Sequence, residues 1–221
     1  MWAMQRGSPG AGKPHAGKCG ELTPLRQRGG DGGYNTIPLP SGNLGLLIGV
    51  EMTPRLRIRE ARAEDLPALE AVRYADTPAI HRDRLRDAAA GHLHYLVAEL
   101  SGTIVGFGLL AVTRPINWPD QATPQHLPLV LDLYVAEAHR GQGIGTSIVQ
   151  YMEELALDAG YDRLFLSVDP VDNAGAHALY VRLGYVALNA QPYREHWRFT
   201  DSDGKAHEGS GWQIDMCKEL Q

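Results

Sequence analysis

The sequence predicts an α/β fold, and three of its features support this prediction. Between residues 55 and 219, segments whose apolar residues alternate with period 2 are interleaved with segments of helical spacing. The run Leu129–Val135 (LVLDLYV) is apolar almost throughout, as expected for a strand whose two faces are both covered. A glycine-rich turn at residues 140–146 connects this run to an amphipathic segment.

The predicted strands are alternating or continuously apolar, and turn residues separate them. Leu56-Arg57-Ile58-Arg59 alternates, Ser101-Gly102 joins the second strand to the third, and Asp203-Gly204 is a strong hairpin dipeptide between the last two. In order, the strands are expected at residues 56–59, 95–99, 104–112, 129–135, 164–168, 185–188, 194–200 and 212–218.

The predicted helices are recognised by their ends. Acidic residues near Glu64 and a proline at Pro67 favour a first helix that continues through Val72. A second helix over 77–90 has Thr77 as a cap, and a third over 146–159 stops at Gly160. The fourth helix follows Asn173 and ends before Gly184.

The first fifty residues have a different composition. They hold 12 of the 25 glycines and show no strand or helix period before residue 44. Five basic and two acidic residues give this stretch a charge of +3, which leaves −8 on the remainder of a chain with a net charge of −5. Such sequence buries too little apolar surface to offset chain entropy. We expect residues 1–51 to be a disordered extension, with Met52 as a plausible true start, and residues 52–221 to form one domain.

Composition also excludes several classes of protein. The two cysteines, Cys19 and Cys217, form neither a disulfide framework nor a zinc motif, so no metal is expected. The acidic balance argues against a nucleic-acid partner. No apolar run is long enough to span a membrane, and the first twenty residues contain no apolar core of a secretory signal. We therefore expect a cytoplasmic protein, monomeric or homodimeric, without a nucleic-acid or membrane partner.

The segment Arg140-Gly141-Gln142-Gly143-Ile144-Gly145-Thr146 carries the functional information. Glycines let successive N–H groups turn inward and form an anion-binding concavity, and the following helix adds positive potential at its N-terminus. This pattern indicates a phosphate or pyrophosphate site. A tight connection between strand and helix is the alternative.

The segment resembles a signature of the GNAT superfamily of acetyl-CoA-dependent N-acetyltransferases, (Gln/Arg)-x-x-Gly-x-(Gly/Ala), at Arg140, Gly143 and Gly145. The resemblance continues in Asn173-x-x-Ala176-x-x-Leu179-Tyr180 and in Leu183-Gly184-Tyr185, and the order of elements matches over roughly residues 55–219. It implies a mixed, mostly antiparallel central sheet flanked by helices. It also implies a splayed parallel strand pair, 129–135 with 164–168, that holds the cofactor.

The resemblance implies that acetyl-CoA is the co-substrate and that an amine, on a small molecule or a peptide, is the acceptor. Backbone N–H groups would hold the pantetheine and pyrophosphate, and the N–H of Val135 would polarise the thioester carbonyl. Asn173 would contact the cofactor arm, with a simple helix cap as the alternative or additional role. The residues implied to bind the cofactor are Leu133, Val135, Arg140, Gly141, Gln142, Gly143, Ile144, Gly145, Thr146, Asn173 and Tyr180.

The resemblance also implies that Tyr180 is the general acid that protonates the departing thiolate, and packing of its helix is the alternative. The general base is less determined, because Ser167 stands where some relatives carry glutamate. Asp132 is a candidate base, acting directly or through water. A carboxylate that points elsewhere is equally compatible with its position.

Several other motifs are weaker indications of function. Residues 7–13 fit the start of a phosphate-binding loop, but Pro14 replaces the Ser/Thr that would bind magnesium. His92-Leu93-His94 has no evident third metal ligand. The aromatic residues Trp118, Tyr193, Trp197 and Trp212 either line an acceptor pocket or form a satellite core. A non-catalytic acetyl-CoA sensor or partner module with the same fold is the alternative function.

Overall fold

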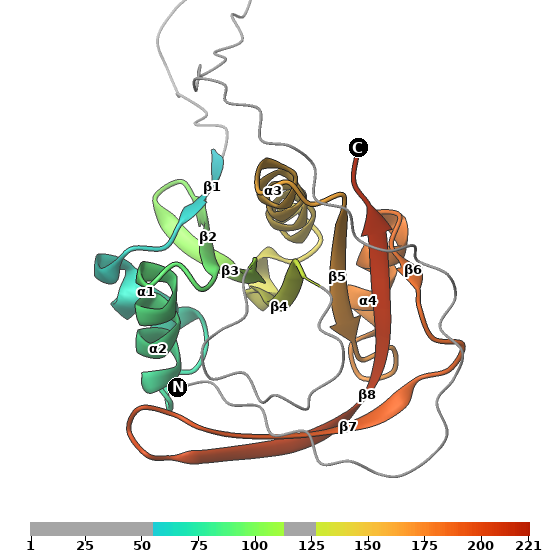
Figure 1. Ribbon diagram of the computed structural model, residues 1–221. Coiled ribbons are helices and arrows are strands. Elements are labelled where there is room, and N and C mark those ends of the chain that lie inside the picture. Colours follow the sequence, from blue (N-terminus) through green and yellow to red (C-terminus); the bar gives the residue numbers. More distant parts are fainter. Residues whose placement is uncertain (1–54, 113–126) are drawn as a thin grey trace, which may run out of the picture.

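The computed structural model describes residues 55–112 and 127–221 and has a mixed sheet at its centre (Figure 1). Strands in this part of the chain follow the order β1-β2-β3-β4-β5-β8-β6, and β7 pairs with β8 outside that path. All neighbours are antiparallel except β4 and β5. The strands are β1 (Leu56–Glu60), β2 (His94–Leu100), β3 (Thr103–Ala111), β4 (Leu129–Val135), β5 (Arg163–Val168), β6 (Val186–Ala187), β7 (Tyr193–Thr200) and β8 (Ala206–Glu219).

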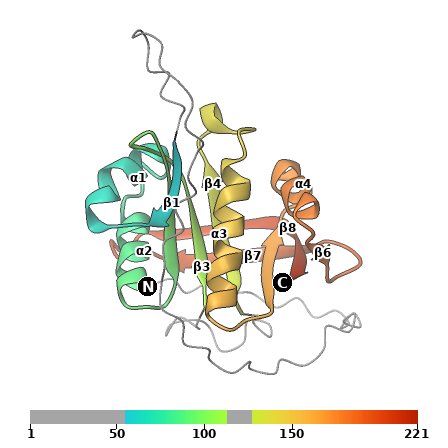
Figure 2. The same ribbon diagram turned by 90° about the horizontal axis from the view of Figure 1, so that it is seen from above.

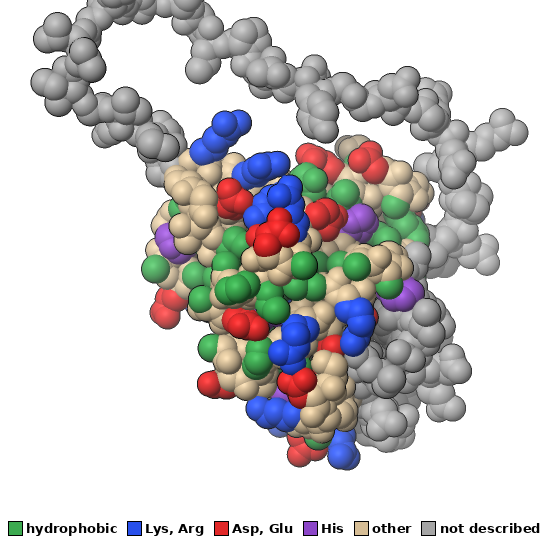
Figure 3. All heavy atoms as spheres, turned by 90° about the vertical axis from the view of Figure 1, so that its left-hand side faces the viewer, with side chains coloured by type: hydrophobic (Ala, Val, Ile, Leu, Met, Phe, Trp, Pro, Cys, Tyr) green, Lys and Arg blue, Asp and Glu red, His purple; other side chains and the backbone are tan. Residues whose placement is uncertain are grey.

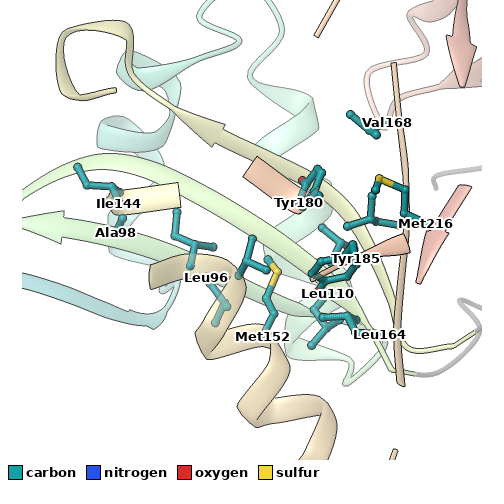
Figure 4. Close-up of a cluster of buried hydrophobic side chains, with 14 of the residues drawn as sticks. Leu96, Ala98, Leu110, Ile144, Met152, Leu164, Val168, Tyr180, Tyr185 and Met216 are labelled. Carbon is teal, nitrogen blue, oxygen red and sulfur yellow. The ribbon is translucent and has the colours of Figure 1, made fainter. Parts of the chain in front are cut away.

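Four helices cover the sheet, α1 (Leu66–Val72), α2 (Ala79–Ala89), α3 (Ile144–Asp158) and α4 (Ala174–Arg182), and short 3-10 turns precede α1 and α3. Side chains of α3 and α4 pack into the main hydrophobic cluster (Figure 4). Side chains of α1 and α2 pack with a second cluster on the other face, around Tyr95 and Phe107. Gly108 lets α3 lie directly on β3, because a Cβ there would lie 2.7 Å from Cγ2 of Ile148.

Strands β4 and β5 separate after a short contact. The parallel ladder pairs only Leu129 with Phe165 and Val130 with Leu166. A bulge in β4 then shifts its register with β3, whereas β4 continues to Val135 without β5. This confirms the predicted fold class, a mostly antiparallel sheet with a splayed parallel pair.

The β7–β8 hairpin is longer than expected and reaches across the molecule on the side of the sheet opposite α3 (Figures 1 and 2). Its tip docks on α2, where Arg82 pairs with Asp203 at 2.6 Å and the Ser202 N–H donates to Asp83 at 3.0 Å. The predicted start of β8 near residue 212 was wrong, since the strand begins at Ala206. The indole of Trp197 lies against Gly209, leaving no room for a Cβ, so glycine is required there inside a strand.

The remaining differences lie at helix ends. Helix α3 begins at Ile144 instead of residue 146, because Gly143 takes a positive φ of 82° and serves as its N-cap. Helix α2 begins at Ala79, and Pro78 rather than Thr77 is its N-cap. The proposed extension at residues 1–51 and the motif at residues 7–13 lie outside the described residues. No helix within residues 55–112 and 127–221 has the length and hydropathy needed to cross a membrane.

Candidate functional site

A pocket of about 780 Å³ lies between the end of β4, the glycine-rich turn and α4. Nine of the predicted cofactor-binding residues line it, namely Leu133, Val135, Arg140, Gly141, Gly143, Ile144, Gly145, Thr146 and Asn173. Gln142 and Tyr180 are not among its lining residues. The structure therefore brings together residues that lie up to 40 positions apart in sequence.

The glycine-rich turn has the backbone geometry expected of an anion-binding loop. Gly141 and Gly143 have φ values of 75° and 82°, which side-chain-bearing residues rarely adopt, and space is open beside both. The turn leads into α3, whose first N–H groups have no partner within the helix and carry positive potential. Gly145 serves a different purpose, because a Cβ there would lie 3.3 Å from Leu179 of α4.

The edge of β4 that faces the pocket keeps its N–H groups available. Ala136 donates its N–H to Val105 of β3, and peptide groups alternate in direction along a strand. The N–H groups of Val135 and Leu133 therefore point away from β3, toward the separation from β5. The Val135 carbonyl points the same way and accepts a hydrogen bond from Arg140 Nε at 3.0 Å. This bond ties the turn to the end of the strand.

The lining of the pocket is rich in cations. Arg73, Arg140 and Arg182 contribute guanidinium groups, and Asp172 contributes a single carboxylate. Together with the N-terminus of α3, these groups favour a ligand that carries several negative charges.

Asn173 and Gln142 adopt different arrangements. Asn173 is the N-cap residue of α4, but its side chain makes no capping hydrogen bond, so the structure does not support the simple cap. Asn173 is one of the residues that line the pocket. Gln142 donates from Nε2 to the carbonyl of Ala138 at 3.4 Å, which orients it back toward the preceding 3-10 turn.

Tyr180 projects from α4 into the main cluster, where its ring packs edge-on to that of Tyr185 (Figure 4). Only 5% of the residue is exposed. Burial raises the pKa of the Tyr180 phenol above its ordinary value, and the charge of Asp132 raises it further. The hydroxyl thus stays protonated at neutral pH. Both the acid role and the packing role fit this environment.

Asp132 lies on β4 where the strands separate, and it faces α1 and α2. Its carboxylate forms an ion pair with Arg84 at 2.7 Å and with Arg73 at 3.5 Å. The Tyr74 hydroxyl approaches the same carboxylate at 3.5 Å. Two guanidinium groups thus balance the charge of this carboxylate. The role of Asp132 as a base stays a prediction.

Sequence reasoning missed the buried polar network behind Asp132. His81 accepts at Nδ1 from the Tyr95 hydroxyl at 2.6 Å and donates from Nε2 to the Arg73 carbonyl at 2.8 Å, as a neutral imidazole must. Burial lowers the pKa of His81 to about 4. Arg84, also buried, lies over the rings of Tyr74 and Phe107. The residue pattern of α2 gave no signal for this network.

The aromatic residues near the C-terminus divide between surface and packing roles. Trp212 is 42% exposed and lies near the Arg194 guanidinium, whereas Trp197 stacks on Phe199. Tyr193 reaches back to the sheet and donates to Asp215 at 2.9 Å. Trp118 lies outside the described residues. His94 pairs with Glu60 at 2.7 Å, and the described part of the chain contains no group of side chains arranged to hold a metal.

Residues 56–185, more than half of the chain, match the acetyltransferase (GNAT) family. The chain belongs to this family. The expected resemblance is therefore confirmed. The match ends before β7 and β8, so the hairpin that docks on α2 lies beyond it.

Individual GNAT relatives are distant. The thialysine N-epsilon-acetyltransferase of Bos taurus is 30% identical over 169 residues, which cover 67% of this chain and 93% of that protein. The aminoalkylphosphonate N-acetyltransferase of Salmonella typhimurium is 28% identical, covering 68% of this chain and 93% of the relative. A putative acetyltransferase from the same species, solved with acetyl-CoA, shares the fold with a TM-score of 0.53 at 18% identity, covering 76% of this chain and 95% of that one.

Other GNAT relatives match only in part. The mycothiol acetyltransferase of Jonesia denitrificans is 36% identical over 121 residues, or 53% of this chain and 33% of that protein. The uncharacterized N-acetyltransferase YobR of Bacillus subtilis matches over 28% of this chain and 25% of its own length. The chain thus spans a third or less of these two relatives.

Proposed function

We propose that this protein transfers the acetyl group of acetyl-CoA to a primary amine and that Tyr180 is the general acid. The observation that carries the proposal is the cationic pocket at the separation of β4 and β5, bounded by the glycine-rich turn and the N-terminus of α3. One end of the pocket carries groups that favour anions, and the free edge of β4 forms the other end. They suit the phosphate-rich end and the amide-containing arm of coenzyme A, respectively.

The pocket residues fit acetyl-CoA from one end to the other. The N–H groups of residues 140–145 and the guanidinium groups of Arg140 and Arg182 would bind its phosphates. The pantetheine arm would pair with β4 at the edge that β5 leaves open, as an added strand does. The Val135 N–H would then donate to the thioester carbonyl and stabilise the charge that develops there. Asn173 would contact the arm from the opposite wall.

Tyr180 meets the electronic requirement of a general acid. A thiolate leaving the acetyl group needs a proton, and a phenol whose pKa is raised by burial still carries one at neutral pH. The side chain emerges from α4 next to Leu179, which lines the pocket. The role of Asp132 as a base, direct or through water, stays a prediction.

The substitution Tyr180→Phe tests the general-acid role, because it keeps the ring and removes the hydroxyl. Acid–base assistance typically contributes ~10²–10⁴-fold. We expect a loss of kcat in that range, unchanged acetyl-CoA affinity by calorimetry and a similar melting temperature. Because the pKa of Tyr180 is raised, the alkaline limb of the parent's pH profile should lie above the ordinary tyrosine range and vanish in the variant. Equal turnover by both proteins would make Tyr180 a packing residue.

The amines to be tested as acceptors are chosen from the names of the relatives. Thialysine and 2-aminoethylphosphonate represent the acceptors named for two of them, and a short peptide with a free N-terminus represents a third class. Thiol release is measured with each amine. Acetyl-CoA binding without thiol release for any of the three would favour the non-catalytic sensor or partner module.

A cytoplasmic monomer or homodimer that needs neither nucleic acid nor membrane stays a prediction. On the side that carries α1 and α2, basic and acidic side chains are interspersed (Figure 3).

A further inference from the structure

We infer that Asp215 on β8 is the carboxylate that binds the ammonium group of the acceptor and takes up its proton. The inference rests on the proposed function and deepens it, because it assigns the acceptor side of the same site. The residue lies beyond the family match at residues 56–185 and was not singled out from the sequence.

Asp215 lies at the separation of the two parallel strands. It is the cross-strand partner of Ser167, which directly follows Leu166, the last residue of β5 that pairs with β4. Leu166 and Val168, the neighbours of Ser167, are buried in the main cluster on the α3–α4 side, as is Met216 beside Asp215. Ser167 and Asp215 therefore point to the opposite face, toward which Asp132 also points from β4.

This face of β5 is open at Ser167. The strand lies inside the sheet, and Leu164, Phe165, Leu166 and Val168 are all buried, yet Ser167 is exposed. The side chain of Ser167 is therefore accessible from this face of the sheet. The β7–β8 hairpin lies on this side of the sheet, opposite α3 (Figure 1). An acceptor bound against this face would approach the thioester carbon from the side of the sheet opposite α3 and α4.

The hydrogen bonds of Asp215 leave its charge available. Ser167 Oγ and the Tyr193 hydroxyl both donate to Oδ1, at 2.6 and 2.9 Å. Both donors are neutral, and Oδ2 receives no hydrogen bond from any residue that the structure describes. Nor does any described Lys, Arg or His form an ion pair with this carboxylate. Asp132 differs, because Arg84 and Arg73 already balance its charge. An ammonium group would therefore find its counter-charge at Oδ2 of Asp215.

The proposed acetyl transfer accounts for every bond and proton with groups already named. Oδ2 of Asp215 removes one proton from the acceptor ammonium, and the neutral nitrogen attacks the thioester carbonyl carbon. The C–N bond forms and the C–S bond breaks, while Tyr180 gives its proton to the sulfur. The nitrogen loses a second proton, which restores Tyr180, and Asp215 releases the first proton to solvent. The net products are an amide, coenzyme A and one proton.

The test compares Asp215→Asn with the parent, because the amide keeps an oxygen for Ser167 and Tyr193 but removes the charge. Asp158→Asn, at the exposed C-terminal end of α3, is the control for the loss of one negative charge. Thiol release is measured with thialysine, 2-aminoethylphosphonate and the free-N-terminus peptide across pH, together with acetyl-CoA affinity and melting temperature.

At neutral pH we expect kcat/KM for the amine to fall ~10²–10⁴-fold in Asp215→Asn. The deficit should shrink as pH rises toward the pKa of the amine, ~10 for a lysine-like group, because the acceptor then arrives already deprotonated. Acetyl-CoA affinity should not change, and Asp158→Asn should behave as the parent. A purely structural role would instead give a deficit independent of pH.

Each other outcome overturns a specific statement. An active parent with an equally active Asp215→Asn variant, a pH-independent deficit, or a loss of acetyl-CoA affinity in the variant overturns the role of Asp215 and leaves the proposed function intact. A parent that binds acetyl-CoA but acetylates none of the three amines overturns the proposed function, and the role of Asp215 falls with it.

Discussion

Replacing Asp132 by asparagine separates a structural carboxylate from a catalytic one. The side chain of Arg84 is 4% exposed and that of Asp132 is 20% exposed, and their charged atoms lie 2.7 Å apart. Burial opposes the charged form of Arg84 and lowers its pKa, but the charge of Asp132 is the largest of the opposing effects, and the net pKa is raised. Asp132→Asn removes that charge beside a guanidinium that stays in place.

The magnitude follows from the burial of the pair. Removing one partner of a buried ion pair costs about 3–5 kcal/mol, and the partial exposure of Asp132 favours the lower end, about 3 kcal/mol. For a domain of this size each kcal/mol lowers the melting temperature by roughly 2–4 °C, so we expect a drop of roughly 6–12 °C. Arg84→Met should cost less, because Asp132 keeps Arg73 and contact with solvent.

The assay is denaturant unfolding of the parent, both single variants and the double variant. The two changes should be strongly non-additive, with the double variant more stable than Asp132→Asn alone, because it removes both buried charges. Turnover is measured on the folded fraction. An Asp132→Asn variant as stable as the parent but without activity would refute this reasoning and support the base role instead.

Two further predictions concern the phosphate loop and the N-terminal extension. Gly143→Ala should lower acetyl-CoA affinity at least tenfold while costing about 1–2 kcal/mol of stability from its positive φ. Gly102→Ala, at φ 87° in the β2–β3 turn away from the pocket, is the matched control and should cost stability without affinity, so equal affinities in parent and Gly143→Ala would contradict the loop assignment. A truncated chain beginning at Met52 should keep its melting temperature and acetyl-CoA affinity, and a large loss of either would make residues 44–50 part of the folded structure.

The fold could be predicted because its elements follow local patterns. Period and capping residues located all the helices and strands of the described part, and the run Leu129–Val135 marked a strand covered on both faces. The start of β8 was not predicted, because Gly209 is a glycine on account of the indole of Trp197, which lies on another strand. Local sequence does not contain such a partner.

The two halves of the proposed site also differ in how far the sequence predicts them. The glycine-rich turn proposed to bind phosphates is continuous in sequence, so its glycines and the helix behind it could be recognised together. The pair Arg84–Asp132 and the pair Ser167–Asp215 each join residues 48 positions apart. They depend on strand register and on the docking of α2, which periodicity does not determine. The proposed acceptor side could therefore be recognised only from the structure.

The position of β8 has a consequence for synthesis of the chain. This late strand lies between β5 and β6, both of which precede it in sequence (Figure 1). Strand β5 forms a six-residue ladder with β8 but pairs through only two residues with β4. A nascent chain that has emerged only as far as β7 therefore carries a strand with an almost unpaired, hydrophobic edge, the kind of edge that templates aggregation. The sheet can close only after translation has delivered residues 206–219, so this edge of β5 can pair with another chain until then.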